Sequence, residues 1–543
     1  MNNVLTAHGK RWNWSTGALL TAAFVMTVPT LVILLGGGTT GTPAVWVRTA
    51  MASLRQGPGD NLHGGLLVEG FDQESCHSRY QSAMYRRNPG RQPSEHLVSK
   101  LRRHEALQRR CGPGTAAYSD ALEQLKSGKN AASPECKYLV SISYRGLGNR
   151  ILAAASAFLY ALLTDRVLLV DPSNDMGELF CEPFPNTSWL LPPGFPLWSF
   201  NQDTPERYGR MRENGVLRTD VSNGGSPANS KAADMPAFAY IHLDWNQTDH
   251  DQLFFCDEDQ RLLSNFQWLV MRTDSYIVPG LFLVDTFRQK LATLFPEPDA
   301  VFHHLGRYLF HPTNHVWGLV TRYYSAHLGW AQRRVGIQVR VFPRSPESPE
   351  LLERITKCTQ KEGLLPRVVD TEEPAVTAAP PTGAGRGVKS NAVVITSLKA
   401  WYYEQMKGMY WENATAGGEV VVVSQPSHEE YQHYGVKSHE YKAWAEIYLL
   451  SLTDLLVTTG KSTFGYVAQG LAGMRPWVLL GQANGTAGNN RPPCSRDVSP
   501  EPCFHIAPLH DCKRRRDSGK IVPHVRHCED VPTGLKLVDR KEW

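Results

Sequence analysis

The segment Tyr138–Asp171 constrains the fold most, because it has the pattern of a strand, a glycine turn, a helix and a second strand. Tyr138–Tyr144 alternates apolar with small polar residues, which favours a strand. Ile151–Leu163 is apolar and rich in alanine, as expected of a buried helix. Val167–Val170 predicts the return strand, so the segment indicates a β–α–β unit of an α/β protein.

The turn before this helix contains Gly146 and Gly148, with Asn149 next to them and Arg145 and Arg150 on either side. Glycines allow a tight turn and the close approach of a ligand to the backbone. A helix N-terminus adds free N–H groups and a dipole that favours phosphate. The turn matches neither a Walker loop nor G-x-G-x-x-G, so a phosphate site and a purely structural turn both stay open.

The second half of the chain alternates strands and helices in a regular way. Apolar strands separated by helices indicate a parallel sheet covered on both faces, and ligands of such sheets bind beyond the carboxyl ends of the strands. The predicted strands are 334–342, 392–398, 419–424, 454–459 and 477–481, and the predicted helices are 315–333, 349–361, 399–410, 441–452 and 462–472.

Three strand ends in this half carry side chains that suit a phosphate. Arg340 follows one strand, and Thr396 and Ser397 end the next. Ser462 and Thr463 join a third strand to a helix, where their hydroxyl and N–H groups would cap the helix or hold phosphate. We therefore expect two Rossmann-like domains that face a cleft suited to a nucleotide-sugar donor.

The N-terminus predicts a membrane anchor. No charged residue lies between Arg11 and Arg48, and Ala18–Leu35 is nearly all apolar and about long enough to cross a bilayer. The basic residues before this span place the N-terminus in the cytosol by the positive-inside rule. A cleaved signal peptide is the alternative. The predicted segments are a cytosolic tail 1–14, a signal anchor 15–38, a lumenal stem 39–135, an acceptor-side domain 136–310, a donor domain 311–490 and a cysteine-rich extension 491–543.

The cysteines and sequons agree with a lumenal body. All 10 cysteines follow the apolar span, and the absence of a C-x-x-C pair favours disulfides over zinc. N-glycosylation sequons begin at Asn186, Asn246, Asn413 and Asn484. The net charge of +5 is small for 543 residues, which argues against nucleic acid as a partner.

The sequence Asp249-His250-Asp251 matches the D-x-D pattern, in which two carboxylates chelate one divalent cation. Such short matches are common, and the alternative is that one carboxylate acts as a base or positions the acceptor. The histidines of HHLGRYLFHPTNH, which begins at His303, lack an H-E-x-x-H pattern, so we expect them to serve packing and helix capping rather than metal binding.

Longer motifs resemble the plant cell-wall fucosyltransferase family from about Cys136 to Val538, whereas the stem and residues 368–391 do not. The motifs include RGLGNRILAAASAFLYALLTDRVLLVD, FCEPFPNTSWLLP, VFHHLGRYLFHPTNHVWG, VGIQVRVF, STFGYVAQGLAG and PHVRHCED. The resemblance implies a GT-B-like fold and a single-pass type II protein of the Golgi membrane. It also implies transfer of L-fucose from GDP-fucose with inversion, and no cofactor or metal.

The resemblance also implies roles for individual residues. Arg340 matches the arginine that binds the diphosphate, although related fucosyltransferases have His-x-Arg where this chain has Gln338-Val339-Arg340. Asp249 or Asp251 would act as base or position the acceptor. The implied GDP-fucose site comprises Gly146, Gly148, Asn149, Arg150, Gln338, Arg340, Thr396, Ser397, Ser462, Thr463 and Phe464.

The expected acceptor is O2 of a terminal galactose on xyloglucan, and arabinogalactan-protein glycans are the alternative. Arg340 and the helix N-termini would stabilise the negative charge that grows on departing GDP. Further partners left open are a second copy of the chain and other Golgi glycosyltransferases. Two rival functions remain: a metal-dependent lumenal transferase that uses the D-x-D pattern, and a non-catalytic Golgi glycan-binding protein.

Overall fold

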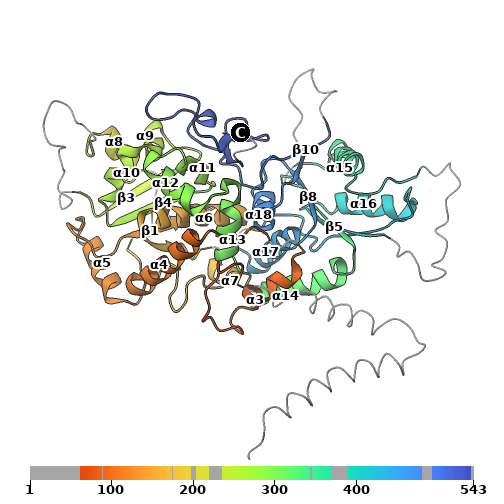
Figure 1. Cartoon of the computed structure of the whole chain (residues 1–543), viewed down its shortest axis with the longest axis horizontal. Helices are drawn as coiled ribbons and strands as arrows, with labels where there is room; N and C mark the ends of the chain where they lie inside the picture. Colours follow the sequence, from red (N-terminus) through yellow and green to blue (C-terminus); the bar gives the residue numbers. More distant parts are fainter. Residues whose placement is uncertain are drawn as a thin grey trace, which may run out of the picture. The chain divides into compact units, whose positions relative to one another are not determined.

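The folded part of the chain contains two separate, mainly parallel sheets (Figure 1). The computed structural model describes residues 62–87, 90–173, 175–196, 203–218, 235–342, 345–369, 389–433, 435–479 and 492–539. All of them belong to one unit that begins at Asp60. The predicted tail 1–14, anchor 15–38, the first part of the stem and Asn484 lie outside the described residues.

The first sheet has the strand order β2-β1-β4-β3, and all its strand pairs are parallel. Tyr138 of β1 lies opposite Val167 of β2 on one side and Trp268 of β4 on the other. Its strands are almost fully buried, as expected of a parallel sheet covered on both faces. The strands are β1 (Tyr138–Ile142), β2 (Val167–Val170), β3 (Phe238–Leu243) and β4 (Trp268–Thr273).

Helix α6 (Leu147–Thr164) connects β1 to β2 as predicted, but it begins four residues before the predicted start. Gly146 is its N-cap, so Asn149 and Arg150 lie in the first helical turn rather than in a loop. Among the described residues, α6 is the one helix long and apolar enough to cross a membrane. Because 89% of this apolar segment is buried inside the protein, α6 is a core helix.

The second sheet has the order β10-β9-β8-β5-β6-β7. All five predicted strands are present and pair in parallel, and β10 adds an antiparallel edge. The strand predicted to reach Phe342 ends at Gln338, so Arg340 lies just beyond the strand. The strands are β5 (Arg333–Gln338), β6 (Ser390–Thr396), β7 (Val420–Ser424), β8 (Leu455–Thr459), β9 (Trp477–Leu479) and β10 (Ser495–Arg496).

Helices cover both sheets and fill the region between them. Helix α17 packs against α18 and α14, and α18 also packs against α6 of the first half. The longer helices after α6 are α10 (Asp257–Ser264), α12 (Asp285–Leu294), α13 (Val301–Leu309), α14 (Asn314–Tyr323), α15 (Pro349–Lys361), α16 (Trp401–Glu412), α17 (Lys437–Ser451) and α18 (Thr463–Ala472). The shorter ones are α7 (Met176–Leu179), α8 (Tyr208–Glu213), α9 (Asp249–Gln252) and α11 (Val278–Leu281).

The segment predicted as a stem is folded from Leu62 onward. Residues 77–126 form α3 (His77–Tyr85), α4 (Glu95–Cys111) and α5 (Ala116–Lys126). Leu97 and Leu101 of α4 are fully buried against the core, and Gln108 bonds the backbone of Leu168 in β2. The exposed basic residues of α4, Arg103, Arg109 and Arg110, lie outside its buried face.

The cysteines form five disulfides, which confirms the sequence prediction. Two of them fasten the predicted stem to the first half, and the others fasten the C-terminal segment to both halves and within itself. That segment contains β11 (Val525–His527) and β12 (Leu535–Leu537). The pairs are Cys76–Cys181, Cys111–Cys136, Cys256–Cys512, Cys358–Cys494 and Cys503–Cys528.

Candidate functional site

An open cleft lies at the carboxyl ends of β5 and β6. Leu147 at the start of α6 lines it from the first half, so both halves contribute to the cleft. The predicted donor residues that line the cleft are Gln338, Arg340, Thr396, Ser397 and Phe464. The position agrees with the rule that ligands of parallel sheets bind beyond the strand ends.

Arg340 supplies a cation at this cleft. Its backbone N–H donates to Thr459 Oγ1 at 2.8 Å, which ties the end of β5 to the end of β8. Its guanidinium lies 5.1 Å from the centre of the exposed ring of Phe342. Arginine in such a place suits a diphosphate, because its planar fork presents several N–H donors.

The neighbouring strand ends add neutral hydrogen-bonding groups. Gln338 is buried, and its Oε1 accepts from Thr459 Oγ1 at 3.2 Å. The Thr396 hydroxyl is buried and has no hydrogen-bond partner among the described residues, so it is available to a ligand in the cleft. Ser397 is partly engaged, because its hydroxyl accepts from the backbone N–H of Lys399 at 3.1 Å.

The N-terminus of α18 reaches the cleft through Phe464. Ser462 is the N-cap, and its hydroxyl accepts from the backbone N–H of Gly465 at 3.4 Å. The Thr463 hydroxyl donates to Asn149 Oδ1 at 3.2 Å, so it contacts the first half. Capping by Ser462, which the sequence left open beside phosphate binding, is therefore present.

The glycine turn mainly serves contact between the halves. A Cβ atom on Gly148 would lie 2.8 Å from the backbone carbon of Thr463, so only glycine lets α6 and α18 approach this closely. A Cβ on Gly146 would lie 2.9 Å from Gln432, which lines the cleft. Asn149 Nδ2 donates to the backbone oxygen of Asp274 at 2.7 Å.

Arg150 does not extend into the cleft. It is 3% exposed, and its guanidinium pairs with Glu440 of α17 at 2.5 Å. Burial lowers the pKa of Arg150, and Glu440 opposes that shift. Arg150 lies in the first turn of α6, which faces α17, and its charge is therefore used in an ion pair between the halves.

The D-x-D pattern lies on a short helix, α9, and not at a strand end. Residues two apart on a helix do not face each other, so the two carboxylates do not converge on one cation. Asp251 is buried in a capping box with Thr248 and pairs with Arg207 at 2.5 Å. Asp249 lines a separate surface hollow with Arg288 and Lys513, and neither carboxylate is among the described residues of the cleft.

The segment from Ser427 to Glu446 contributes cleft residues that the sequence analysis missed. His439, Lys442 and Glu446 lie three and four residues apart on α17, and this helical spacing of polar residues is the signal that could have found them. Glu429 accepts from Lys442 and lies 3.3 Å from His439 Nδ1. The Ser427 hydroxyl donates to Glu446 at 2.5 Å.

Burial raises the pKa of Glu446 to about 7. Above pH 4.5, the ordinary pKa of this carboxyl group, the unfolded chain releases the proton, whereas the folded protein keeps it up to about pH 7. The free energy of unfolding therefore falls as the pH rises between these two values. We expect Glu446→Gln to match the wild type at pH 4 and to be more stable at pH 8 by up to about 3 kcal/mol. Urea unfolding at both pH values measures this, with exposed Glu430→Gln as control; equal differences at both pH values would contradict it.

The carboxyl edge of the first sheet carries aromatic and acidic groups. Asp274 follows β4, is buried, and accepts from the Ser143 hydroxyl at 2.5 Å. Arg272 lies 4.5 Å from the ring of Tyr144 and pairs with Asp244 at 3.1 Å. Tyr144 and Trp245 are exposed, so this edge presents aromatic side chains, whereas Asp244 and Asp274 are buried and paired.

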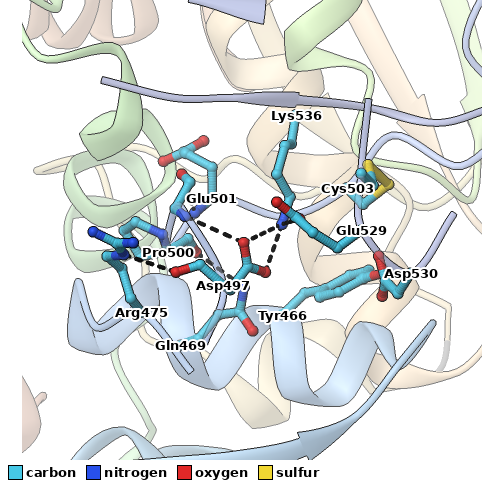
Figure 2. A network of polar contacts seen from close by, with 12 residues as sticks. Tyr466, Gln469, Arg475, Asp497, Pro500, Glu501, Cys503, Glu529, Asp530 and Lys536 are labelled. Carbon is cyan, nitrogen blue, oxygen red and sulfur yellow. Dashed lines mark hydrogen bonds and ion pairs between the residues drawn. A yellow bond between two sulfur atoms is a disulfide. The ribbon is translucent and has the colours of Figure 1, made fainter. Parts of the chain in front are cut away.

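The C-terminal segment packs against α18 through a network of polar contacts (Figure 2). The buried ammonium of Lys536 donates to both oxygens of Asp497 at 2.6 and 2.5 Å and to Glu529 at 3.1 Å. Asp530 accepts from the backbone N–H of Lys461 at 2.7 Å and from the Tyr466 hydroxyl. Lys461 has a left-handed φ of 61°, and this contact holds the turn that leads into α18.

A family model described as xyloglucan fucosyltransferase matches residues 47–513. The chain belongs to the xyloglucan fucosyltransferase family. The match starts well before Cys136, so the similarity includes most of the predicted stem, and the expectation that the stem is unrelated is wrong. The packing of α3 and α4 into the core explains this.

Named members of the family cover nearly the whole chain. A galactoside 2-alpha-L-fucosyltransferase from Pisum sativum is 50% identical over 514 residues, which is 91% of this chain and 87% of the relative. The enzyme of the same description from Arabidopsis thaliana is 51% identical over 486 residues, 88% of this chain and 83% of the relative.

A solved structure supports the same assignment. A mutant of FUT1 from Arabidopsis thaliana in complex with GDP has a TM-score of 0.78 and 50% sequence identity, over 88% of this chain and 100% of that one. The xyloglucan fucosyltransferase assignment confirms the predicted family, the α/β GT-B-like fold and the enzyme class, a fucosyltransferase.

The predicted glycosylation sites differ in exposure. Asn186 and Asn246 are exposed, although Asn246 Oδ1 lies 2.7 Å from His242 Nε2. Asn413 is half-buried, and its Nδ2 donates to the backbone oxygen of Met409 at 3.0 Å. Of the three, Asn186 offers its side chain most openly.

Proposed function

We propose that this protein is an inverting galactoside 2-α-L-fucosyltransferase that transfers L-fucose from GDP-fucose to O2 of a terminal galactose on xyloglucan. The observation that carries the proposal is Arg340 in a cleft at the strand ends of the second sheet, in a chain half identical to enzymes named for this reaction. The solved relative was captured with GDP, the product that the donor would leave.

The donor site of this proposal comprises the cleft residues and the turns beside them. Arg340 faces the diphosphate, and the Thr396 hydroxyl, together with Gln338 and Ser397, completes the wall at the strand ends. Phe464 and the N-terminus of α18, capped by Ser462, form the opposite side. In this proposal Gly146, Gly148, Asn149, Thr463 and Arg150 position the two walls relative to each other, because the structure uses them in contacts between the halves.

The chemistry follows from the charges. As the bond from fucose to GDP breaks, negative charge grows on the diphosphate, and Arg340 stabilises it in the cleft. The anomeric carbon gains positive charge, and galactose O2 attacks from the opposite face. Such a carbon needs little activation of the nucleophile, so the hydroxyl proton passes late to water or to an acceptor hydroxyl. Asp251 is an unsuitable base because Arg207 and Thr248 occupy it.

For its place in the cell we propose a single-pass type II protein of the Golgi membrane, with the anchor at 15–38 and N-glycans at the predicted sequons. The five disulfides support a lumenal body, since such bonds persist in oxidising compartments. The acceptor-side and donor domains of this proposal correspond to the two sheets, and a second copy or another Golgi glycosyltransferase remains a proposed partner.

Removal of metal tests the reaction and the acceptor together. We expect transfer from GDP-fucose to galactosylated xyloglucan oligosaccharide to be unchanged in EDTA, because the D-x-D carboxylates are held apart on α9. Product masses are compared with and without EDTA, and with an arabinogalactan glycan as the competing acceptor. Transfer to arabinogalactan alone would replace the acceptor in this proposal, and loss of transfer in EDTA would overturn its metal-independent chemistry.

A further inference from the structure

The aromatic ring of Phe342 is exposed directly after two residues of the donor cleft, Arg340 and Val341. Phe342 is 66% exposed, whereas Val339 and Val341 are buried in the core of the second half. Side chains of an extended chain alternate in this way, so Arg340 and Phe342 share the side that faces away from this core.

The ring of Phe342 contacts the cation of the cleft. The guanidinium carbon of Arg340 lies 5.1 Å from the centre of the ring, within the distance at which an aromatic face attracts a cation. Among the described residues, Phe342 belongs to no hydrophobic cluster and stacks on no other ring, so Arg340 is the ring contact that it makes there. Packing in the core therefore does not account for a large aromatic side chain at this position.

The backbone that carries both side chains is fixed. The N–H of Arg340 donates to Thr459 Oγ1 at 2.8 Å, and the backbone oxygen of Phe342 accepts from the N–H of Ser345 at 2.9 Å. The long side chain of Arg340 has many rotamers even on a fixed backbone, and holding it in one of them costs conformational entropy. A contact that favours one orientation of the guanidinium reduces this cost before the donor binds.

We propose that Phe342 is a positioning residue for fucosyl transfer, which attracts the guanidinium of Arg340 to its ring face and orients it for the diphosphate. This inference rests on the proposed function, in which Arg340 stabilises the charge that grows on departing GDP. A cation that is already oriented needs no reorganisation when that charge develops. Phe342 acts through Arg340, so the electron density of its ring matters as well as its shape.

Stepwise fluorination tests the contact with little change in the shape of the ring. Fluorine withdraws electron density from the aromatic face, so each added fluorine weakens its attraction for a cation. Mono-, di- and trifluorophenylalanine are placed at position 342 of the full chain in detergent, and kcat and the affinity for GDP are measured. Both are expected to fall steadily, to about two- to fivefold below the wild type with three fluorines. Values that do not depend on fluorination would overturn the proposal.

Ordinary variants give a second test. Phe342→Leu is expected to lower kcat and GDP affinity about two- to fivefold, and Phe342→Trp, whose ring attracts cations more strongly, to retain both. Combined with Arg340→Ala, Phe342→Leu should cause no further loss, because the cation is absent. Trp330 is a matched control, since it is 45% exposed and lies before β5 instead of after it, and Trp330→Leu should change neither value. An equal loss from Phe342→Leu with and without Arg340 would overturn the proposal.

The GDP measurement separates this inference from the proposed function. If the wild type binds GDP but transfers fucose to neither galactosylated acceptor, the proposed function fails, whereas a GDP affinity that falls with fluorination still supports the contact. If the wild type transfers fucose and fluorination changes neither kcat nor GDP affinity, the role of Phe342 is wrong and the proposed function stands.

Discussion

Replacing Arg340 with alanine is expected to lower kcat for fucosyl transfer by about 10²- to 10³-fold, the loss found when one preorganised group that stabilises a developing anion is removed. Arg340 supplies the cation at the strand ends of the second sheet, and its backbone is fixed by Thr459. The charge it faces in the proposed reaction grows as GDP departs, so the loss should appear mainly in kcat. Steady-state kinetics with GDP-fucose and galactosylated xyloglucan measures it.

Two further variants separate charge from geometry. Arg340→Lys keeps the charge but loses the planar fork, so we expect activity between the wild type and the alanine variant. Arg333 lies at the other end of the same strand and donates to the backbone of Gly363, so Arg333→Ala should leave kcat unchanged. If Arg340→Ala retained full kcat and GDP affinity, another group would have to neutralise the leaving diphosphate.

The strands of the second sheet could be predicted because they depend on local pattern, although β5 ends four residues before its predicted end. Short runs rich in apolar and β-branched residues predict β5, β6 and β8, and the carboxyl ends of a parallel sheet lie at one edge. Gln338, Arg340 and Thr396 therefore meet in the cleft as expected. The position of a side chain at a strand end is determined by the sheet, so it can be predicted without knowing the contacts made by distant parts of the chain.

Other features depend on contacts that local pattern does not contain. Arg150 meets Glu440, 290 residues later in the chain, and this ion pair holds its guanidinium buried between α6 and α17. The D-x-D pattern makes Asp251 a candidate metal ligand or base, but Thr248, three residues before it, forms a capping box with it. The α4 helix is basic on one face, so average composition concealed Leu97 and Leu101 on the buried face.

The Arg150–Glu440 pair should make a large electrostatic contribution to stability. The two side chains are 3% and 4% exposed, and Nη2 of Arg150 lies 2.5 Å from Oε2 of Glu440. Removing one partner of such a pair leaves an uncompensated buried charge and costs about 3–5 kcal/mol. We expect this loss for Glu440→Leu and for Arg150→Leu in urea unfolding, with little dependence on salt because buried charges are poorly screened.

The double variant separates the pair from the cost of an unpaired charge. Arg150→Leu with Glu440→Leu leaves no buried charge, so it should lose much less than the sum of the single variants, and the difference is the coupling between the two side chains. The exposed pair Lys437–Glu178 joins neighbouring parts of the same two halves, and Lys437→Leu should change stability little because solvent screens it. Additive single losses would mean that the two charges are solvated independently; strong coupling would mean that the ion pair holds α6 against α17 and keeps both walls of the cleft in register.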